Sequence, residues 1–433
     1  MRILLLHPPG NFKKLSDAVE NLGLGYIAAV LRRDGHEVEI FDANAQCMKV
    51  DETIRELLKR DFDCLGITAL NAYTKQVISI ARAVRQKKKN ALIVMGGYLP
   101  SLETEQLFAA CPEIDFIVRG EGEISASEVF GRIERGERWQ DAPGIAYLND
   151  GALVMNPLPP LIQDLDTLPF PARDSIAQIP TLTQTSIAGS RGCYHNCSFC
   201  SISAFYELSG SRLPRFRSPE NIVDEIESVV ASTGRTMFVF ADDDFIGPGP
   251  KCRERAIKIA DQIKARKLKI NFSIECRADE VDEDILKLLK EAGLSGLFLG
   301  IESGVQHQLD TFNKGTTVEQ NKRAIEIVRK MDLRLRSGLI IFDPYTTMDD
   351  LMEDLKFFQE MGPSLEPALE SMVLLYRGTP LTERVRADGL LIEKGMELKY
   401  RFKDRKVGML WRVLNTCVTC SQFIKRVASP GAR

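Results

Sequence analysis

Short apolar runs alternate with helical patterns along residues 1–135. The runs lie at 3–6, 38–41, 64–70, 91–97 and 115–120, and helical patterns lie near 23–34, 51–60, 74–89, 102–110 and 124–135. Continuous apolar strands separated by helices are typical of a parallel sheet covered on both faces. The pattern therefore predicts a doubly wound, Rossmann-like domain over residues 1–140 with a five-stranded parallel sheet. Its ligand crevice should lie beyond the carboxyl ends of the strands.

Residues 141–183 show a different pattern. The segment GIAYLNDGALVM at 144–155 predicts a β-hairpin that turns at Asn-Asp-Gly. Five prolines follow between residues 157 and 171, and proline fits neither a helix interior nor a central strand. We therefore expect a hairpin followed by an extended, proline-rich linker.

Strand and helix patterns alternate again over residues 184–388. Apolar runs lie at 185–190, 237–242, 270–277, 296–304, 335–344 and 371–376, and helical patterns lie near 219–232, 252–267, 283–292, 318–332, 348–361 and 380–388. Six such repeats predict a partial (β/α)6 barrel with its functional residues at the carboxyl ends of the strands. Residues 389–433 are mixed and basic, and we expect them to form a small C-terminal extension. The predicted fold class is α/β throughout.

The composition narrows the class of protein. Of 433 residues, 44% are hydrophobic and 27% charged, the balance of a folded protein with several domains. Lysine plus arginine number 57 and aspartate plus glutamate 60, and this net charge of −3 argues against a protein that grips nucleic acid phosphates. No segment reaches the roughly 18 apolar residues of a membrane span, and the apolar start is too short for a secretory signal. We expect a cytoplasmic protein with neither nucleic acid nor a membrane as partner.

Three of the ten cysteines crowd into eight residues directly after the first strand of the second half. The segment GSRGCYHNCSFC places Cys193, Cys197 and Cys200 in a C-x-x-x-C-x-x-C pattern. Three thiolates on one short loop converge easily on a metal centre, and on a four-iron cluster they would leave one iron open. A zinc site with His195 as fourth ligand is the alternative, although zinc sites usually bring two paired knuckles.

Cys417 and Cys420 form the other cysteine pair, more than 200 residues away. The two residues could bind a metal or form a redox pair. At helical spacing, packing residues are the more common interpretation.

The cysteine spacing, with Phe199 before the third cysteine, resembles the signature of the radical S-adenosylmethionine (SAM) superfamily. The likeness continues through RFRSPENIVDEI, FADDDFIG, IECRADEVD, GLFLGIESG, IIFDPYTTMDDL and YRGTPL. These motifs resemble the subgroup with an N-terminal domain similar to cobalamin-binding domains. The segments GLGYIAAVLRRDGHEVEIFDAN, GITALNAY, MGGYLPS and VRGEGE resemble that domain in turn. The resemblance covers roughly residues 1–390.

The resemblance implies a [4Fe-4S] cluster, S-adenosylmethionine and a set of residues that hold them. The three cysteines would bind the cluster, which receives an electron from a donor such as flavodoxin or ferredoxin. Cleavage of the sulfonium would then leave a 5′-deoxyadenosyl radical. The residues implied to contact SAM are Phe199 beside the adenine, Asp242, Asp243 and Asp244 near the methionine ammonium, Arg277 near its carboxylate, and Glu302 and Ser303 near the ribose or methionine.

The first domain leaves two alternatives open. The D-x-H-x-x-G loop of histidine-on cobalamin proteins is absent, but many radical SAM relatives also lack the lower histidine. In such relatives the nucleotide tail of cobalamin would lie on strand-end loops, which here carry Thr68, Asn71, Gly96, Gly97 and Tyr98. Either the domain binds cobalamin or it is retained as a scaffold. A dinucleotide fingerprint at residues 23–28 lies too far from the first strand to suggest a dehydrogenase.

We therefore expect a radical SAM enzyme that modifies a small-molecule metabolite by cobalamin-dependent methyl transfer to carbon. The alternative is a cobalamin-independent radical dehydration or rearrangement of a sugar-like substrate. A nucleic acid modifier of the methylthiolating type would need a further cluster domain and a basic barrel, and neither is evident. A sensor that uses the first domain would leave the cysteine loop unexplained.

Overall fold

The computed structural model describes residues 1–10, 20–179, 184–362 and 371–428, without the side chains of 418–428. The chain divides into two compact units. The first unit contains Met1–Tyr194, Ser201–Ile274 and Asp284–Ser295, and the second contains His195–Cys200, Glu275–Glu283 and Gly296–Arg433. The cysteine loop therefore contributes to both units.

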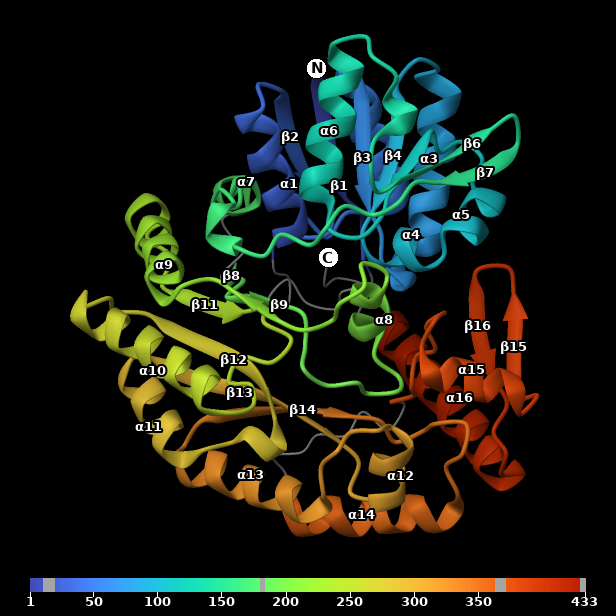
Figure 1. Ribbon diagram of the computed structural model, residues 1–433. Coiled ribbons are helices and arrows are strands. Elements are labelled where there is room, and N and C mark those ends of the chain that lie inside the picture. Colours follow the sequence, from blue (N-terminus) through green and yellow to red (C-terminus); the bar gives the residue numbers. More distant parts are fainter. Residues whose placement is uncertain (11–19, 180–183, 363–370, 429–433) are drawn as a thin grey trace. The chain divides into compact units, whose positions relative to one another are not determined.

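The N-terminal sheet has seven strands in the order β2-β1-β3-β4-β5-β6-β7 (Figure 1). Its parallel part consists of β1 (Arg2–His7), β2 (Glu37–Asp42), β3 (Cys64–Thr68), β4 (Leu92–Gly96) and β5 (Phe116–Val118). These are the five predicted parallel strands. Their apolar residues, such as Leu6, Leu65 and Ile93, are almost fully buried.

The predicted hairpin extends this sheet. It consists of β6 (Ile145–Asn149) and β7 (Ala152–Met155), and β6 pairs antiparallel with β5. The sheet therefore has seven strands where five were predicted. The backbone groups on the outer edge of β5 need partners, and the hairpin supplies them.

Helices cover the sheet in pairs. α1 (Leu22–Arg33) packs against α6 (Gly122–Glu134), and α2 (Val50–Lys59) packs against α3 (Thr74–Lys87). α1 begins where the Asn21 side chain accepts a hydrogen bond from the Leu24 amide at 2.9 Å. The short helices α4 (Tyr98–Leu102) and α5 (Thr104–Ala110) follow β4 directly. This arrangement confirms the predicted doubly wound pattern.

The sheet of the second half has the strand order β14-β13-β12-β11-β8. Its strands are β8 (Thr185–Ile187), β11 (Met237–Phe240), β12 (Asn271–Arg277), β13 (Leu294–Glu302) and β14 (Arg334–Leu339). The sixth predicted strand, at 371–376, makes only one parallel bridge, between Phe342 and Met372. The amides of Ile341 and Phe342 both donate to the Ser371 carbonyl, at 3.1 and 2.9 Å, so a regular ladder cannot continue.

The helices after these strands match the predicted alternation. They are α9 (Pro219–Thr233), α10 (Pro250–Ala265), α11 (Glu283–Glu291), α13 (Val318–Lys330), α14 (Met348–Met361) and α15 (Pro380–Ala387). Local sequence sets their ends: Ser218 caps α9 by accepting from the Asn221 amide, Pro219 occupies the first turn, and Gly234 ends the helix with φ +69°. The loop region before α9 contains β9 (Ser190–Arg191), α8 (Ser201–Glu207) and β10 (Arg215–Phe216).

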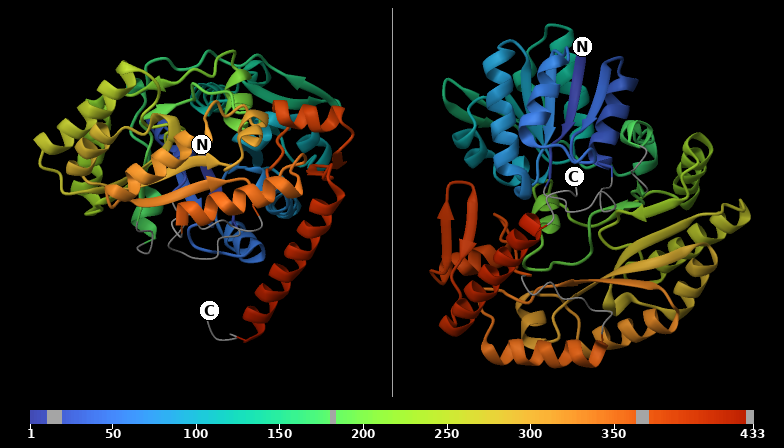
Figure 2. Two further views of the ribbon diagram at one scale, coloured as in Figure 1. Left: turned by 90° about the horizontal axis from the view of Figure 1, so that it is seen from below. Right: turned by 180° about the vertical axis from the view of Figure 1, so that it is seen from behind.

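The C-terminal segment is a hairpin and a helix. β15 (Leu391–Lys394) pairs antiparallel with β16 (Glu397–Tyr400), and α16 (Arg405–Ala428) follows as one continuous helix (Figure 2). Val407 at the start of α16 is fully buried in a cluster with Ile341 and Phe342. The cluster joins the start of α16 to the end of the five-stranded sheet.

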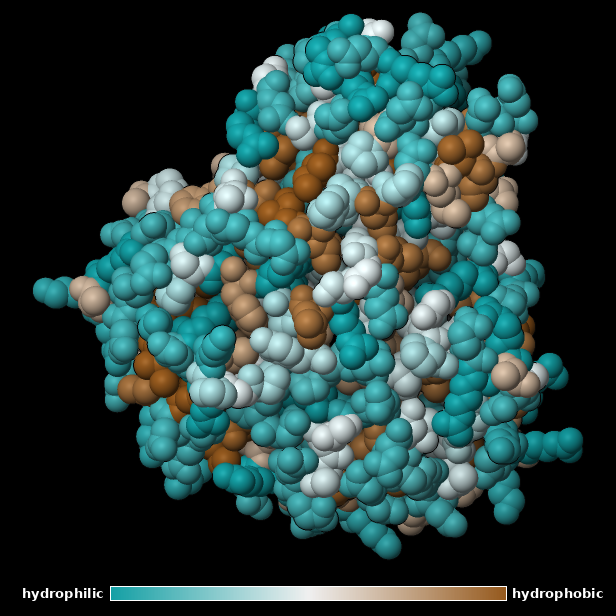
Figure 3. Space-filling view, viewed as in Figure 1, coloured by the Kyte–Doolittle hydropathy of each residue, from teal (hydrophilic) through white to brown (hydrophobic). Residues whose placement is uncertain are grey.

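Hydrophilic side chains predominate on the face shown in Figure 3, and hydrophobic ones form small groups among them. Among the described residues, no helix combines the length and the apolar character that a membrane crossing requires.

Candidate functional site

The cysteine loop joins β9 to α8, and its first part is fixed by a glycine. Gly192 has φ +94°, and a Cβ atom there would lie 2.7 Å from the Arg212 carbonyl oxygen. Only glycine fits this close approach. The next amide, that of Cys193, donates to the same carbonyl at 3.1 Å. The backbone therefore holds Cys193 against the segment that leads to β10.

The second part of the loop belongs to the other unit. The Ser198 amide donates to the Phe312 carbonyl at 2.7 Å, and the Cys200 amide donates to the Cys197 carbonyl at 3.1 Å. Cys197 is buried, whereas Cys200 is partly exposed. The ring of Phe199 packs edge-on against Phe312 with centroids 5.4 Å apart. The contact with Phe312 thus fixes the position of the Phe199 ring within the cysteine loop.

Two cations lie near Cys197. Nη1 of Arg277 is 3.8 Å from the Cys197 Sγ atom, which is hydrogen-bonding distance for sulfur. Burial raises the pKa of the Cys197 thiol, while the charges of Lys314 and Arg277 act in the opposite direction. A low-dielectric pocket with two cations suits a sulfur that bears negative charge when it binds a metal.

Lys314 was not singled out in the sequence. It is buried, and its Nζ atom pairs with Glu302 Oε1 at 2.8 Å. Glu302 ends β13 with φ +62°, next to a register shift between Gly300 and Glu302. Strained backbone at a strand end is common at ligand sites. The signal that was available is the segment FNKGTT, whose glycine follows the lysine directly and adopts φ +69°.

The Ser303 hydroxyl is hydrogen-bonded to neighbouring residues. Its hydroxyl donates to Gln308 Oε1 at 2.6 Å and accepts from the Val305 amide at 2.9 Å. It also lies 3.2 Å from Asp354 Oδ1. With 1% exposure, the side chain stabilises the turn after β13 and does not face open space.

The three adjacent aspartates after β11 have different environments. The Asp242 carboxylate accepts from the Gly189 amide at 2.8 Å and from the Ser190 hydroxyl at 2.6 Å, and it pairs with Arg255 at 3.1 Å. Its oxygens are therefore occupied within the fold. Asp244 Oδ1 accepts from the Gly247 amide at 3.4 Å. Asp243 is half-buried and lines a cavity of the first unit.

This cavity has a volume of about 510 Å³. One side of its lining comes from strand ends and loops of the N-terminal sheet, and the other from the ends of β8 and β11 and from α8. Four of the five residues predicted to lie along a cobalamin tail line it, namely Thr68, Gly96, Gly97 and Tyr98. Asn71 is not part of this lining, and its amide instead donates to Glu103 at 2.9 Å.

Several glycines line the cavity at positions where the fold leaves no room for a side chain. Gly97 has φ +103°, and a Cβ atom there would lie 3.1 Å from the Ala69 carbonyl oxygen. A Cβ atom on Gly66 or Gly122 would meet a leucine or isoleucine methyl group at 2.8 Å. The ring of Tyr98 packs on Phe205 of α8 with centroids 4.4 Å apart. The result is an apolar, glycine-lined hollow of the size of a cofactor site.

Buried ion pairs border the same cavity. Arg191 pairs with Glu123 at 2.6 Å and lies 4.9 Å above the ring of Tyr26. Arg215 binds Glu121 through both terminal nitrogens, at 2.5 and 3.0 Å. Glu121 and Glu123 come from the VRGEGE segment, whereas Arg191 comes from GSRGCYHNCSFC and Arg215 from RFRSPENIVDEI. All four residues therefore lie in segments that the sequence analysis singled out, although their pairing was not predicted. The pairs join α6 to β9 and β10.

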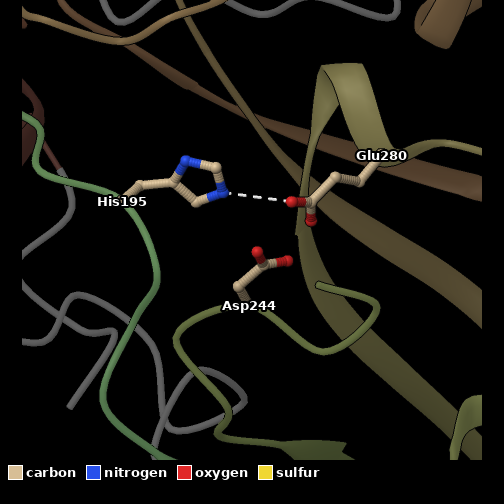
Figure 4. A group of neighbouring side chains, drawn as sticks. All are labelled: His195, Asp244 and Glu280. Carbon is tan, nitrogen blue, oxygen red and sulfur yellow. Dashed lines mark hydrogen bonds and ion pairs between the residues drawn. The ribbon is translucent and has the colours of Figure 1, made fainter. Parts of the chain in front are cut away.

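His195 is held by a carboxylate. Its Nε2 atom lies 3.0 Å from Glu280 Oε1, and Figure 4 shows the pair. The other cysteine pair lies on α16, where Cys417 is exposed and the side chain of Cys420 lies outside the described residues. The function of that pair stays a hypothesis.

The cysteine loop lies within a segment that matches a known protein family. Residues 187–358 match the Radical SAM superfamily, and residues 11–130 match the B12 binding domain. The chain thus carries a radical SAM domain preceded by a B12-binding domain. It is therefore an enzyme of a family that uses a [4Fe-4S] cluster and SAM, acts on small-molecule substrates and needs a reductant. The zinc and dehydrogenase alternatives find no support.

Two relatives align with most of the chain. The chain is 29% identical over 399 residues to "Uncharacterized methyltransferase PH0819" of Pyrococcus horikoshii, covering 90% of this chain and 84% of that protein. It is also 29% identical over 384 residues to the anaerobic magnesium-protoporphyrin IX monomethyl ester cyclase of Rubrivivax gelatinosus, covering 84% of this chain and 67% of the cyclase.

Among solved structures, the cobalamin-dependent S-adenosylmethionine radical enzyme OxsB with aqua-cobalamin and SAM bound matches with a TM-score of 0.81 and 22% identity. The match covers 96% of this chain and 66% of the OxsB chain. The chain thus spans about two thirds of the OxsB chain. This likeness confirms the predicted fold, a Rossmann-like domain followed by a partial barrel.

Proposed function

We propose that the protein is a cobalamin-dependent radical SAM enzyme that transfers a methyl group to a carbon atom of a small molecule. The observation that carries the proposal is the cavity of about 510 Å³, which both the N-terminal sheet and the ends of β8 and β11 line. A methyl group carried by cobalt must reach a radical formed nearby. The strand ends of the second half line the same cavity as the N-terminal sheet, and this supports the proposal.

The lining of the cavity supports cobalamin as the occupant. A broad, flat cofactor needs close backbone approach, which Gly66, Gly97 and Gly122 permit. No histidine occurs among the described residues that line the cavity. His7, at the end of β1, instead pairs with the buried Asp42 at 2.9 Å. Bound cobalamin should therefore have no protein imidazole below the cobalt.

For the cluster, the proposed ligands are Cys193, Cys197 and Cys200. Thiolates are the ligands that iron–sulfur clusters prefer. The two cations near Cys197 favour its ionised form. When bound, the cluster supplies the electron that cleaves SAM to the 5′-deoxyadenosyl radical.

For SAM, the proposed contacts are Asp243 and Glu302, with Phe199 beside the adenine. Asp243 is favoured over Asp242 because Asp243 lines the cavity and Asp242 does not. Ser303 is a weaker candidate because its hydroxyl is bonded within the fold. An external donor such as flavodoxin or ferredoxin and a cytoplasmic location also belong to the proposal.

Cobalamin retention tests the proposal. The protein is reconstituted with iron and sulfide without oxygen, incubated with hydroxocobalamin and desalted. We expect stoichiometric retention with a spectrum that lacks the histidine-on form. Gly97→Ala should lower retention at least about tenfold, because its Cβ atom would meet the Ala69 carbonyl at 3.1 Å and φ is +103°.

Gly35→Ala is the matched control. Gly35 also has a positive φ, +94°, but no atom lies within 4 Å of its virtual Cβ. This variant should pay a similar backbone cost and retain cobalamin normally. Equal loss in both variants would show that Gly97 acts through folding alone.

One relative is named a cyclase, so a reaction other than methyl transfer remains the second candidate. This candidate is a cobalamin-independent radical dehydration or rearrangement. Active SAM cleavage by protein that retains no cobalamin would favour this candidate and reject methyl transfer.

A further inference from the structure

The guanidinium group of Arg277 is bonded within the fold on both of its edges. It ends β12 and is 5% exposed. One edge of its guanidinium group is bound to the Asp279 carboxylate, with Nε to Oδ1 at 3.0 Å and Nη2 to Oδ2 at 3.3 Å. Nη2 also donates to the Lys314 carbonyl oxygen. These bonds fix the plane of the guanidinium group.

The remaining nitrogen faces a cysteine. Nη1 lies 3.8 Å from Cys197 Sγ, and both residues belong to the second unit. Of the two cations near this sulfur, Lys314 is directly paired through Nζ with Glu302 at 2.8 Å. Arg277 is the cation that directs an N–H group at the sulfur itself. A planar guanidinium can bind a carboxylate on one edge and donate from the other.

We propose that Arg277 is a positioning residue that raises the reduction potential of the cluster through a hydrogen bond to Cys197. The proposal rests on the proposed function, in which Cys197 is a cluster ligand. Reduction adds one electron from an external reductant to the cluster, whose negative charge grows by one. A buried N–H donor and a fixed positive charge at a ligand sulfur stabilise that added charge. The arginine that resemblance assigned to the methionine carboxylate thus acts on the cluster.

The test is an EPR-monitored redox titration of the full-length, cluster-loaded protein without SAM. Arg277→Gln removes the positive charge and the planar guanidinium group. It should lower the ratio of reduced to oxidised cluster at a fixed potential about tenfold. For one electron this equals a midpoint about 59 mV lower. Arg277→Lys keeps the charge but cannot bond Asp279 and Cys197 together, so its shift should be smaller and in the same direction.

Arg323→Gln is the control, because Arg323 is an exposed arginine on α13 in the same unit. It removes one positive charge and should leave the midpoint unchanged. If Arg277→Gln does not hold four iron atoms, Arg277→Lys decides the question.

Unchanged midpoints in both Arg277 variants would overturn the proposal. If SAM binding alone then weakened, Arg277 would be a partner of the methionine carboxylate. A wild-type protein that assembles no cluster would instead refute the proposed function, so the two failures are distinguishable.

Discussion

At the scale of single residues, Asp242 and Asp243 are neighbours in sequence with different environments, because Asp242 is paired with Arg255 and Asp243 lines the cavity. Asp242→Asn should leave the buried Arg255 charge without its ion pair and lower the free energy of unfolding by about 3–5 kcal/mol. Asp243→Asn should change stability by less than about 1 kcal/mol, yet weaken SAM binding about tenfold through a lost charge-assisted hydrogen bond. Urea unfolding and SAM titration of cluster-loaded protein measure the two effects. The reverse pattern would contradict the assignment of Asp243.

Asp354 gives a pH dependence at the same scale. Burial raises the pKa of Asp354 to about 6, although the Gly304 amide and Ser303 hydroxyl act in the opposite direction. An unfolded aspartate has a pKa of about 3.9, so the folded state holds a proton between the two values that the unfolded state has lost. This stabilisation is fully present below about pH 4 and is lost as the pH rises through about 6.

The side chain in Asp354→Asn cannot ionise, so this variant should not lose stability as the pH rises through about 6. Its free energy of unfolding, compared with the wild type, should therefore rise between pH 4 and pH 7 by up to about 3 kcal/mol. Urea midpoints at several pH values measure it. Asp349→Asn, at an exposed position in the first turn of the same helix, is the control and should show no such rise. Parallel wild-type and Asp354→Asn curves would refute the explanation.

At the scale of elements, buried ion pairs join α6 to β9 and β10 beside the cavity. Arg215→Ala should leave Glu121 buried with only Arg191 nearby, at 3.5 Å, and destabilise the first unit by about 3–5 kcal/mol. Arg212→Ala is the matched control, because Arg212 pairs with the exposed Glu207 at 3.4 Å and should cost less than about 1 kcal/mol. Thermal unfolding compares the two, and equal effects would contradict the role of the buried pair.

The order of strands and helices along the chain can be predicted from local sequence patterns. The pairing of strand edges cannot, because it depends on the folded sheet. Alternating apolar runs were enough to predict the five parallel strands, and capping residues such as Ser218 mark helix ends locally. The pairing of β6 with β5 depends on which strand edge lies open in the folded sheet. The partial loss of the sixth strand depends on the shared carbonyl of Ser371. Neither the β5–β6 pairing nor the irregular sixth strand can be predicted from the sequence of a single segment.

At the scale of the whole molecule, the same distinction holds for the site. The cysteine loop is contiguous, so its spacing alone predicts a cluster. The Asp242 carboxylate is paired with Arg255 on α10, 13 residues later, and the proposed role of Arg277 depends on its contact with Cys197, 80 residues earlier. The FNKGTT segment marks a turn at Lys314, but the pairing of Lys314 with Glu302 appears only in the folded structure. The contacts made in the folded structure, rather than the residue types, distinguish residues proposed to bind a cofactor from residues that hold them in position.

The most direct test of the central claim is the formation of 5′-deoxyadenosine from SAM under a strong reductant. Reconstituted wild-type protein should carry about four iron atoms and release 5′-deoxyadenosine slowly, even without substrate. The variant with Cys193, Cys197 and Cys200 all replaced by alanine should lose both the cluster and the product. A wild-type protein that binds zinc and leaves SAM intact, or a triple variant that still cleaves SAM, would contradict the account.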